Sequence, residues 1–116
     1  MNAQALIARL AEQRRHWADL PGGVRVRFAR PHETEFARFR LGITIEHVCE
    51  YVDGWDGVTE AVVLGSSIGS DSPVPFDAAL WRDLVRDRID WVQPVAEAIA
   101  KAITDHLAAK DATAKN

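Results

Sequence analysis

The chain has 116 residues and a mass of 12.9 kDa, which suits one domain around one core and leaves no room for a second. Hydrophobic residues make up 47% and charged residues 27%, a balance that is typical of a folded protein and excludes bulk disorder. The net charge of -3 and the pI near 5.7 argue against a dedicated nucleic-acid binder.

The first segment has apolar residues at helical spacing. Leu6, Ile7, Leu10 and Trp17 recur on one side, which predicts an amphipathic helix of at most about four turns. The sequence Pro-Gly-Gly at 21–23 follows it. Proline presets the first central position of a turn and glycine tolerates a positive φ at the second, so we expect a tight reversal there.

Residues 24–28 have the two-residue period of a half-buried strand. Val24, Val26 and Phe28 alternate with Arg25 and Arg27, so the outer face of this strand is basic. Residues 16–20 could pair with it as a β-hairpin, and a neighbouring subunit is an alternative source of the second strand. Because an isolated hairpin is marginally stable, we expect a helix or further strands beneath it.

Two helices are expected between the hairpin and residue 57. Pro31 suits the first position of one helix, with Phe36 and Phe39 pointing inward. The second helix begins at Thr44 and ends near the Gly-Trp-Asp-Gly sequence at 54–57. Its apolar stripe consists of Ile45, Val48, Val52 and Trp55.

Residues 58–75 contain a short apolar run and then a loop. The run at 58–64 is too short for periodicity to separate a strand from a helix, and we favour one helical turn. Glycine, serine, proline and aspartate dominate residues 65–75, which predicts a loop. Asp77 is a typical N-cap, flanked by Phe76 and Trp81 as a hydrophobic staple, so another helix begins there.

The last helix is expected to begin with Asp90 and Gln93 as a capping pair and to include Pro94 in its first turn. Its inward residues are Val92, Val95, Ile99, Ile103 and Leu107. These elements predict an α+β, mainly α-helical fold. It is a small single domain over residues 1–109 with one short β-hairpin and four to five helices, followed by a flexible C-terminal tail at 110–116.

The sequence Gly-Ser-Ser-Ile-Gly at 65–69 matches the G-x-S-x-G elbow of serine hydrolases, with Ser67 as the nucleophile. The elbow requires a helix directly after the serine and a large parallel sheet, whereas loop residues continue here and the chain is short. His106, the one later histidine, falls on the inner stripe of the last helix. We therefore expect no catalytic residues and a protein that is not an enzyme.

Metal and cofactor sites are not expected either. His47 and Cys49 are two residues apart and point to different sides of a helix, and a soft-metal site requires several such ligands. Glu46, Glu50 and Asp53 share one helix face, which we interpret as acidic and solvated. The single cysteine excludes an internal disulfide, and we expect it to be a small core residue of an intracellular protein.

The charges are divided between two parts of the chain. Residues 1–40 contain eight arginines and four acidic residues, whereas residues 41–90 contain ten acidic residues and three arginines. Such a split can bring copies together or attract a complementary partner, and a solvated mixed surface is an equal alternative. We place a candidate protein interface at an exposed tryptophan and the charged faces: Trp55, Glu46, Glu50, Asp53, Arg25 and Arg27.

Four segments taken in order resemble the tail assembly chaperones of long-tailed bacteriophages and prophages. The basic strand Val24-Arg-Val-Arg-Phe-Ala-Arg-Pro31 comes first, and Gly54-Trp-Asp-Gly-Val58 follows. Val74-Pro-Phe-Asp77 then opens a helix, and Asp90-Trp-Val-Gln-Pro94 opens the last one. The order and spacing of these segments carry the resemblance, which spans most of the chain.

The resemblance implies a small, mostly helical protein without a catalytic site that self-associates in the cytoplasm of a bacterial host. Such a chaperone binds the tape-measure protein, the tail tube subunit or both before the tail polymerises. One alternative is a prophage virion component, such as a structural or head-to-tail joining protein. A second is a small nucleic-acid-binding regulator that uses Arg25, Arg27 and Arg30.

Overall fold

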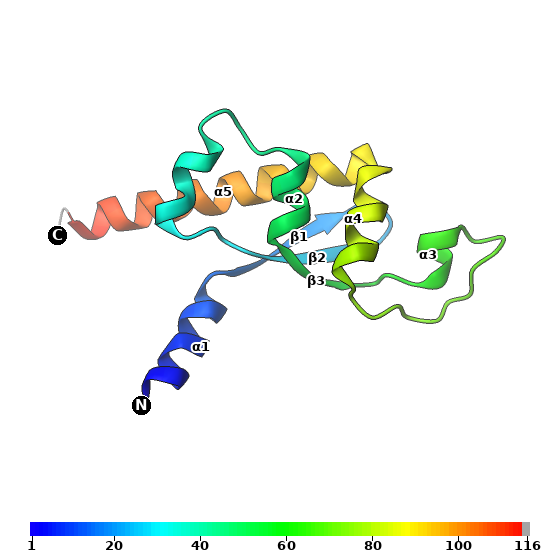
Figure 1. Ribbon diagram of the computed structural model, residues 1–116, viewed down its shortest axis with the longest axis horizontal. Helices are drawn as coiled ribbons and strands as arrows, with labels where there is room; N and C mark the ends of the chain where they lie inside the picture. The colour runs from blue at the N-terminus through cyan, green and yellow to red at the C-terminus, as the bar shows by residue number, and fades with distance from the viewer. Residues whose placement is uncertain (115–116) are drawn as a thin grey trace.

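The computed structural model describes residues 1–114, which form a three-stranded antiparallel sheet with helices around it (Figure 1). The fold is α+β and mainly helical, as the sequence predicts. In chain order the elements are α1 (Ala3–Gln13), β1 (Arg15–Leu20), β2 (Val24–Ala29), the 3-10 helix η1 (Glu33–Phe39), α2 (Ile45–Tyr51), β3 (Val52–Asp56), α3 (Glu60–Leu64), α4 (Ala78–Arg86) and α5 (Ile89–Ala114).

Strands β1 and β2 form the predicted hairpin within one chain. Their register runs from the pair Arg15 and Ala29 to the pair Leu20 and Val24. The turn contains Gly22 and Gly23 with φ of 84° and 78°, a left-handed conformation that glycine adopts without a Cβ clash. The second strand therefore comes from residues 15–20 and not from a neighbouring subunit.

Strand β3 is the main difference from the sequence prediction. The helix predicted from Thr44 to the 54–57 segment ends at Tyr51, and residues 52–56 pair with β2 instead. The register shifts between Arg27 and Phe28, which marks a bulge. Because β2 offers an open hydrogen-bonding edge, non-local pairing outweighs the helical spacing of Val52 and Trp55.

One face of the sheet forms the core. Val24, Val26 and Phe28 of β2 are each at most 1% exposed, and α5 packs against β1 on this side and also contacts α2 and α4. The rings of Trp81 and Trp91 stack with centroids 6.1 Å apart. The buried Trp81 Nε1 donates a hydrogen bond to the carbonyl oxygen of Val48 at 3.2 Å, which ties α4 to α2.

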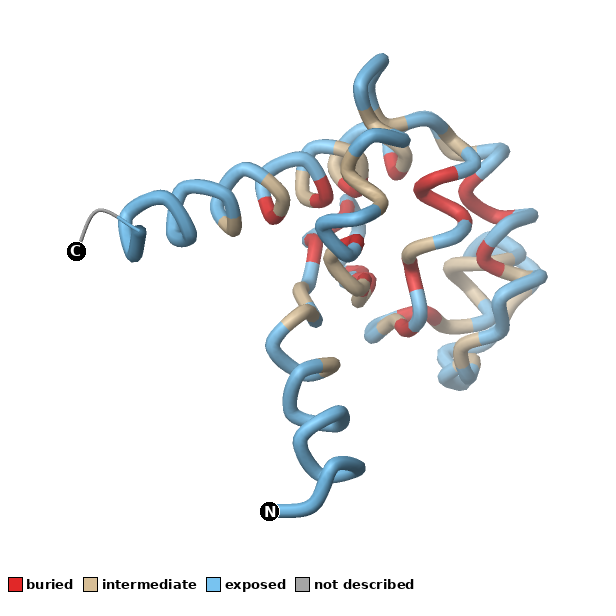
Figure 2. The backbone as a smooth tube through the Cα atoms, turned by 60° about the vertical axis from the view of Figure 1, so that its left-hand side comes forward, coloured by how far each residue is buried: buried red, intermediate tan, exposed pale blue. Residues whose placement is uncertain are grey.

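Helix α1 is shorter than predicted and lies outside the core. It ends at Gln13, so Trp17 belongs to β1 and is 44% exposed. Asn2 caps its start by accepting a hydrogen bond from the Ala5 amide at 2.8 Å. Figures 1 and 2 show α1 projecting away from the sheet, with its free end far from the other elements.

The helices between β2 and α5 lie near the positions predicted for them, but one of them is a 3-10 helix instead of an α-helix. The helix expected after Pro31 is the 3-10 helix η1, in which Phe36 and Phe39 are half-buried. Residues 60–64 form the short helix that we favoured. Asp77 caps α4 by accepting a hydrogen bond from the Leu80 amide at 2.9 Å, as predicted.

Helix α5 differs from the prediction at both ends. It begins at Ile89, so Asp90 lies inside the first turn, and Gln93 donates to Glu97 instead of capping the helix. Pro94 accordingly lies two residues further into the helix than expected, in the second turn. Residues 110–114 of the predicted flexible tail continue the helix, while residues 115 and 116 lie outside the described part. Val95 and Ile99 point inward as predicted, but Leu107 is 47% exposed.

The core arrangement predicts unequal effects for two isoleucines of α5. Ile99 is fully buried and Ile89 is 87% exposed. The Ile99→Ala variant should lower the free energy of unfolding by about 2–5 kcal/mol, because it leaves a cavity. The matched Ile89→Ala variant should change it by less than about 0.5 kcal/mol. Urea unfolding followed by tryptophan fluorescence measures both, and equal losses would contradict this core.

Candidate functional site

The charged residues that we placed at an interface on the sheet pair with each other across β2 and β3. Arg25 Nη2 lies 3.4 Å from Asp56 Oδ2, and Arg27 Nε donates to Asp53 Oδ1 at 2.8 Å. A Cβ at Gly54 would lie 3.1 Å from Arg27 Nη2, a tight contact, so glycine lets the guanidinium approach β3 closely. These arginines are therefore engaged within the chain.

The acidic residues of α2 are also paired. Glu46 accepts from Arg82 Nη1 of α4 at 2.8 Å, and Glu50 accepts from Arg38 Nη2 of η1 at 2.8 Å. Both carboxyl groups have their pKa lowered, chiefly by these hydrogen bonds. The expected acidic face of α2 thus connects neighbouring elements.

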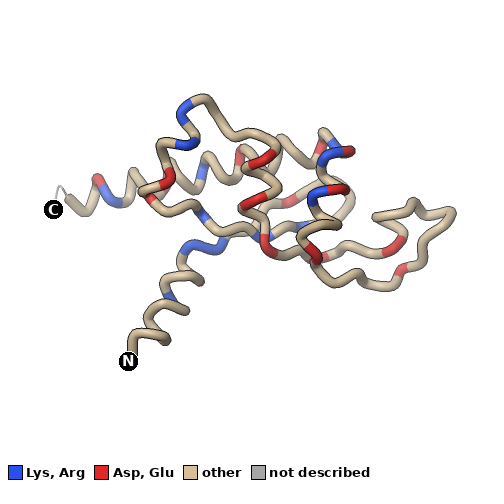
Figure 3. Tube along the Cα trace, in the orientation of Figure 1, with Lys and Arg blue, Asp and Glu red and all other residues tan. Residues whose placement is uncertain are grey.

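In the folded chain, some basic residues of the segment 1–40 form ion pairs with acidic residues of the segment 41–90. Figure 3 shows basic residues gathered where α1 meets the sheet and acidic residues along the segment from α2 to the loop after α3. Three ion pairs join the two parts: Arg25 with Asp56, Arg27 with Asp53 and Arg38 with Glu50. Two of the three arginines on which the nucleic-acid alternative depends, Arg25 and Arg27, are thus paired with aspartates.

Trp17, not Trp55, is the most exposed of the four tryptophans. Trp55 is half-buried, its Nε1 donates to the Val74 carbonyl oxygen at 2.7 Å, and its ring packs edge-on against Phe76 at 5.1 Å. Trp17 lies on the outer face of the sheet, where the Arg25 guanidinium sits 4.4 Å from its ring centroid. Trp55, which we expected to be exposed, is therefore half-buried, and Trp17 is the more exposed of the two.

The residues weighed for catalysis and metal binding do not converge. Ser67 is exposed in a turn, no helix follows before α4, and His106 contacts Glu33 at 2.6 Å instead. His47 Nδ1 accepts from the Thr44 amide at 3.0 Å, and burial raises the pKa of the Cys49 thiol. In residues 1–114 no group of three or more histidine, cysteine, aspartate or glutamate residues is placed to hold a metal ion.

The apolar face of α1 is the exposed surface that sequence reasoning missed. Leu6, Ile7 and Leu10 lie on one side of the helix and are 49%, 62% and 51% exposed, and no residue of α1 is buried (Figure 2). Only Arg14 separates α1 from β1, so the chain has no linker with which to fold the helix back onto the sheet. The sequence pattern extended the helix toward Trp17, so this short connection is visible only in the structure.

A second polar cluster, between η1 and α2, contains the one tyrosine of the chain. The Tyr51 hydroxyl donates to Glu35 Oε2 at 2.9 Å and accepts from Arg38 Nη1 at 2.7 Å. Burial and the hydrogen bond to Glu35 raise the Tyr51 pKa to about 12. The interaction with Glu50 holds the Arg38 pKa above its usual range, so this cluster is a structural link and not a proton donor at neutral pH.

Comparisons with protein-family models, curated proteins and solved structures gave no match to this chain. Within residues 1–114 there is also no helix that is long and apolar enough to cross a membrane. The candidate functional surface therefore rests on the structure alone, and it consists of the apolar face of α1: Leu6, Ile7 and Leu10.

The Tyr51 cluster predicts a pH dependence in the alkaline range. The folded state favours the neutral phenol, whereas an unfolded tyrosine ionises near its ordinary pKa of about 10. The contribution of Tyr51 to stability should therefore be constant below that pH and be lost as the pH rises toward about 12. Because Tyr51 is the only tyrosine, phenolate absorbance reports its pKa directly.

The matched variant for this test is Glu35→Gln. It should lower the Tyr51 pKa, but not to the ordinary value, because burial is the larger cause of the shift. A wild-type midpoint at the ordinary tyrosine value would show that the cluster does not form.

Proposed function

We propose that the protein is a non-catalytic binding protein that covers an apolar partner helix with α1, as a phage tail assembly chaperone does. The observation that carries this proposal is the exposed apolar face of α1, with Leu6, Ile7 and Leu10 each about half exposed or more. A helix that buries nothing in its own domain is a surface for another chain.

The physics of short helices supports this role. An isolated helix below about 12–15 residues is marginal in water, and α1 has 11 residues and no tertiary burial. Covering the remaining halves of three large apolar side chains would contribute on the order of 2–4 kcal/mol. That is enough to convert a marginal helix into a stable one, so binding and helix formation reinforce each other.

The proposed partner is an apolar helical segment of the tape-measure protein, with the tail tube subunit as the other partner of such chaperones. The order of four segments in the sequence supports this choice, as does the chemistry of the surface. A long apolar helix needs its side chains covered until the tube surrounds it, and repeated copies of α1 offer such cover. This role places the protein in the cytoplasm of a bacterial host.

Solubility of tape-measure fragments tests the proposal. Co-expression with the chain should raise the soluble fraction of fragments from a tape-measure protein of the same genome, because α1 covers their apolar helices. The double variant Leu6→Gln with Leu10→Gln should abolish the effect, since glutamine keeps the helix propensity of leucine but removes the apolar face. Soluble and pelleted fragment are quantified after lysis.

The matched control changes two exposed apolar residues elsewhere, Leu41→Gln with Ile68→Gln, at positions that are 103% and 76% exposed. This control should solubilise as well as the wild type. The proposal would be overturned if the α1 double variant solubilised the fragments as well as the wild type does. It would also be overturned if the wild type solubilised none of several different fragments.

Self-association is the second part of the proposal, because identical apolar faces can cover each other when no partner is present. We expect oligomers that grow with protein concentration in light scattering and that persist or strengthen in high salt. Salt weakens exposed ion pairs but not apolar burial. A monomer at every concentration, or oligomers that salt dissolves, would contradict pairing through α1.

A further inference from the structure

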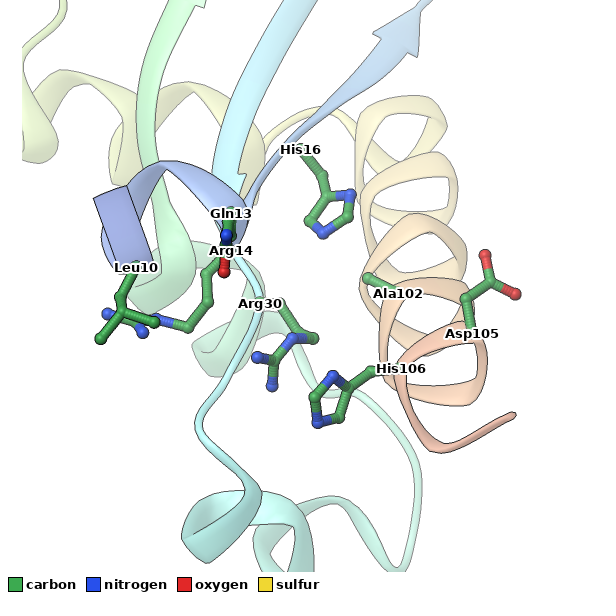
Figure 4. Close-up of a pocket in the computed structure, with 8 residues that line it drawn as sticks. All are labelled: Leu10, Gln13, Arg14, His16, Arg30, Ala102, Asp105 and His106. Atoms are coloured by element: carbon green, nitrogen blue, oxygen red, sulfur yellow. The ribbon is translucent and has the colours of Figure 1, made fainter. Parts of the chain in front are cut away.

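A cavity of about 460 Å³ opens where the end of α1 meets β1, β2 and α5. Figure 4 shows its lining: Arg14, His16 and Arg30 from the strand side and His106 from α5 surround the opening, and Leu10 and Ala102 supply apolar walls. The same view shows the Asp105 carboxylate directed away from these side chains. Asp105 instead accepts from Lys101 Nζ at 2.6 Å.

The two arginines of the cavity lack a carboxylate partner. Arg14 makes no ion pair with any residue of the described chain, and Arg30 Nη1 donates to the Pro31 carbonyl oxygen at 2.6 Å. Glu33, whose charge acts on Arg30, has both carboxylate oxygens engaged at 2.6 Å, with Lys110 and with His106. Within residues 1–114, neither Arg14 nor Arg30 therefore forms an ion pair with a carboxylate.

Backbone pairing holds these like charges together. The Arg30 amide donates to the Arg14 carbonyl oxygen at 2.6 Å, so the two residues extend the β1–β2 ladder and face each other across it. Like charges directly opposite in a ladder are destabilising. Burial is the main cause that lowers the pKa of Arg30, and the nearby charge of Arg14 is the second. Burial is also the main cause that lowers the pKa of His16, and the charge of Arg30 is the second. An anion between the arginines would remove this repulsion.

Leu10 belongs both to this cavity and to the apolar face of α1. A helix that lies on Leu6, Ile7 and Leu10 therefore reaches the cavity at the strand end of α1. We propose that the cavity binds the carboxylate of an acidic side chain on the partner helix covered by α1, held by Arg14 and Arg30. This inference rests on the proposed function and adds its specificity: the partner helix carries one acidic residue beside its apolar face.

Arginine suits this task because its planar guanidinium binds a carboxylate through two parallel N–H groups. Hydrogen bonds to charged groups contribute about 1.5–3 kcal/mol, which corresponds to at least a tenfold change in affinity. The apolar face supplies affinity for many helices, and the cavity selects those with a carboxylate at the matching position.

Two synthetic helical peptides with one identical leucine and alanine face test the selection. They differ only at a position next to the end of that face, where one carries glutamate and the other glutamine. Fluorescence anisotropy with the full chain should show about tenfold tighter binding of the glutamate peptide. The double variant Arg14→Gln with Arg30→Gln should bind both peptides as the wild type binds the glutamine peptide. The control Arg40→Gln should keep the preference.

Equal binding of the two peptides by the wild type would overturn the carboxylate site, and so would a preference that survives in the double variant. Either result leaves binding through α1 intact, so the two proposals fail separately.

A second measurement does not depend on α1 or on folding of a variant. Acetate is added to the wild type at constant ionic strength while the Nε–H signals of Arg14 and Arg30 are followed by NMR. Saturable shifts of both arginine signals would support an anion site in the cavity, even if neither peptide binds. Failure of both peptides to bind would then count against the proposed function only. No shift, or a larger response to inorganic phosphate than to acetate, would overturn the carboxylate assignment.

Discussion

The central strand β2 is the constraint on which the rest of the structure depends. Its two edges are occupied by β1 and β3, its inner residues Val24, Val26 and Phe28 are buried on the core side, and its outer arginines pair with β3. Both hydrogen-bonding edges of β2 are thus filled without α1. The core is complete without a buried residue from α1, and we therefore propose that another chain covers this helix.

The sequence predicted the elements that local chemistry determines. The hairpin follows from the alternation at 24–28 and the glycines of its turn, and α4 begins at Asp77 because aspartate satisfies a free helical amide. Strand β3 could not be predicted in this way. Val52 and Trp55 also fit a helical stripe, and only the open edge of β2, a non-local feature, decides between the two structures.

The candidate site was predictable only in part for the same reason. The sequence identified the charged residues Arg25, Arg27 and Asp53, but their pairing across the sheet depends on register, which residue types alone do not specify. It identified α1 as amphipathic but not the direction of its apolar face. The backbone pairing of Arg14 with Arg30 appears only when the hairpin register is known, and it links the proposed carboxylate site to the same ladder that positions α1.

Hydrogen exchange of the α1 amides, residues 3–13, tests the central claim most directly. In dilute protein these amides should exchange nearly as fast as in an unfolded chain while the amides of β2 remain protected, because no residue of α1 is buried. Adding a tape-measure fragment should slow exchange in α1 by more than about tenfold and leave β2 unchanged. Strong protection of α1 in the dilute monomer, or no change on adding fragments that bind, would contradict the account.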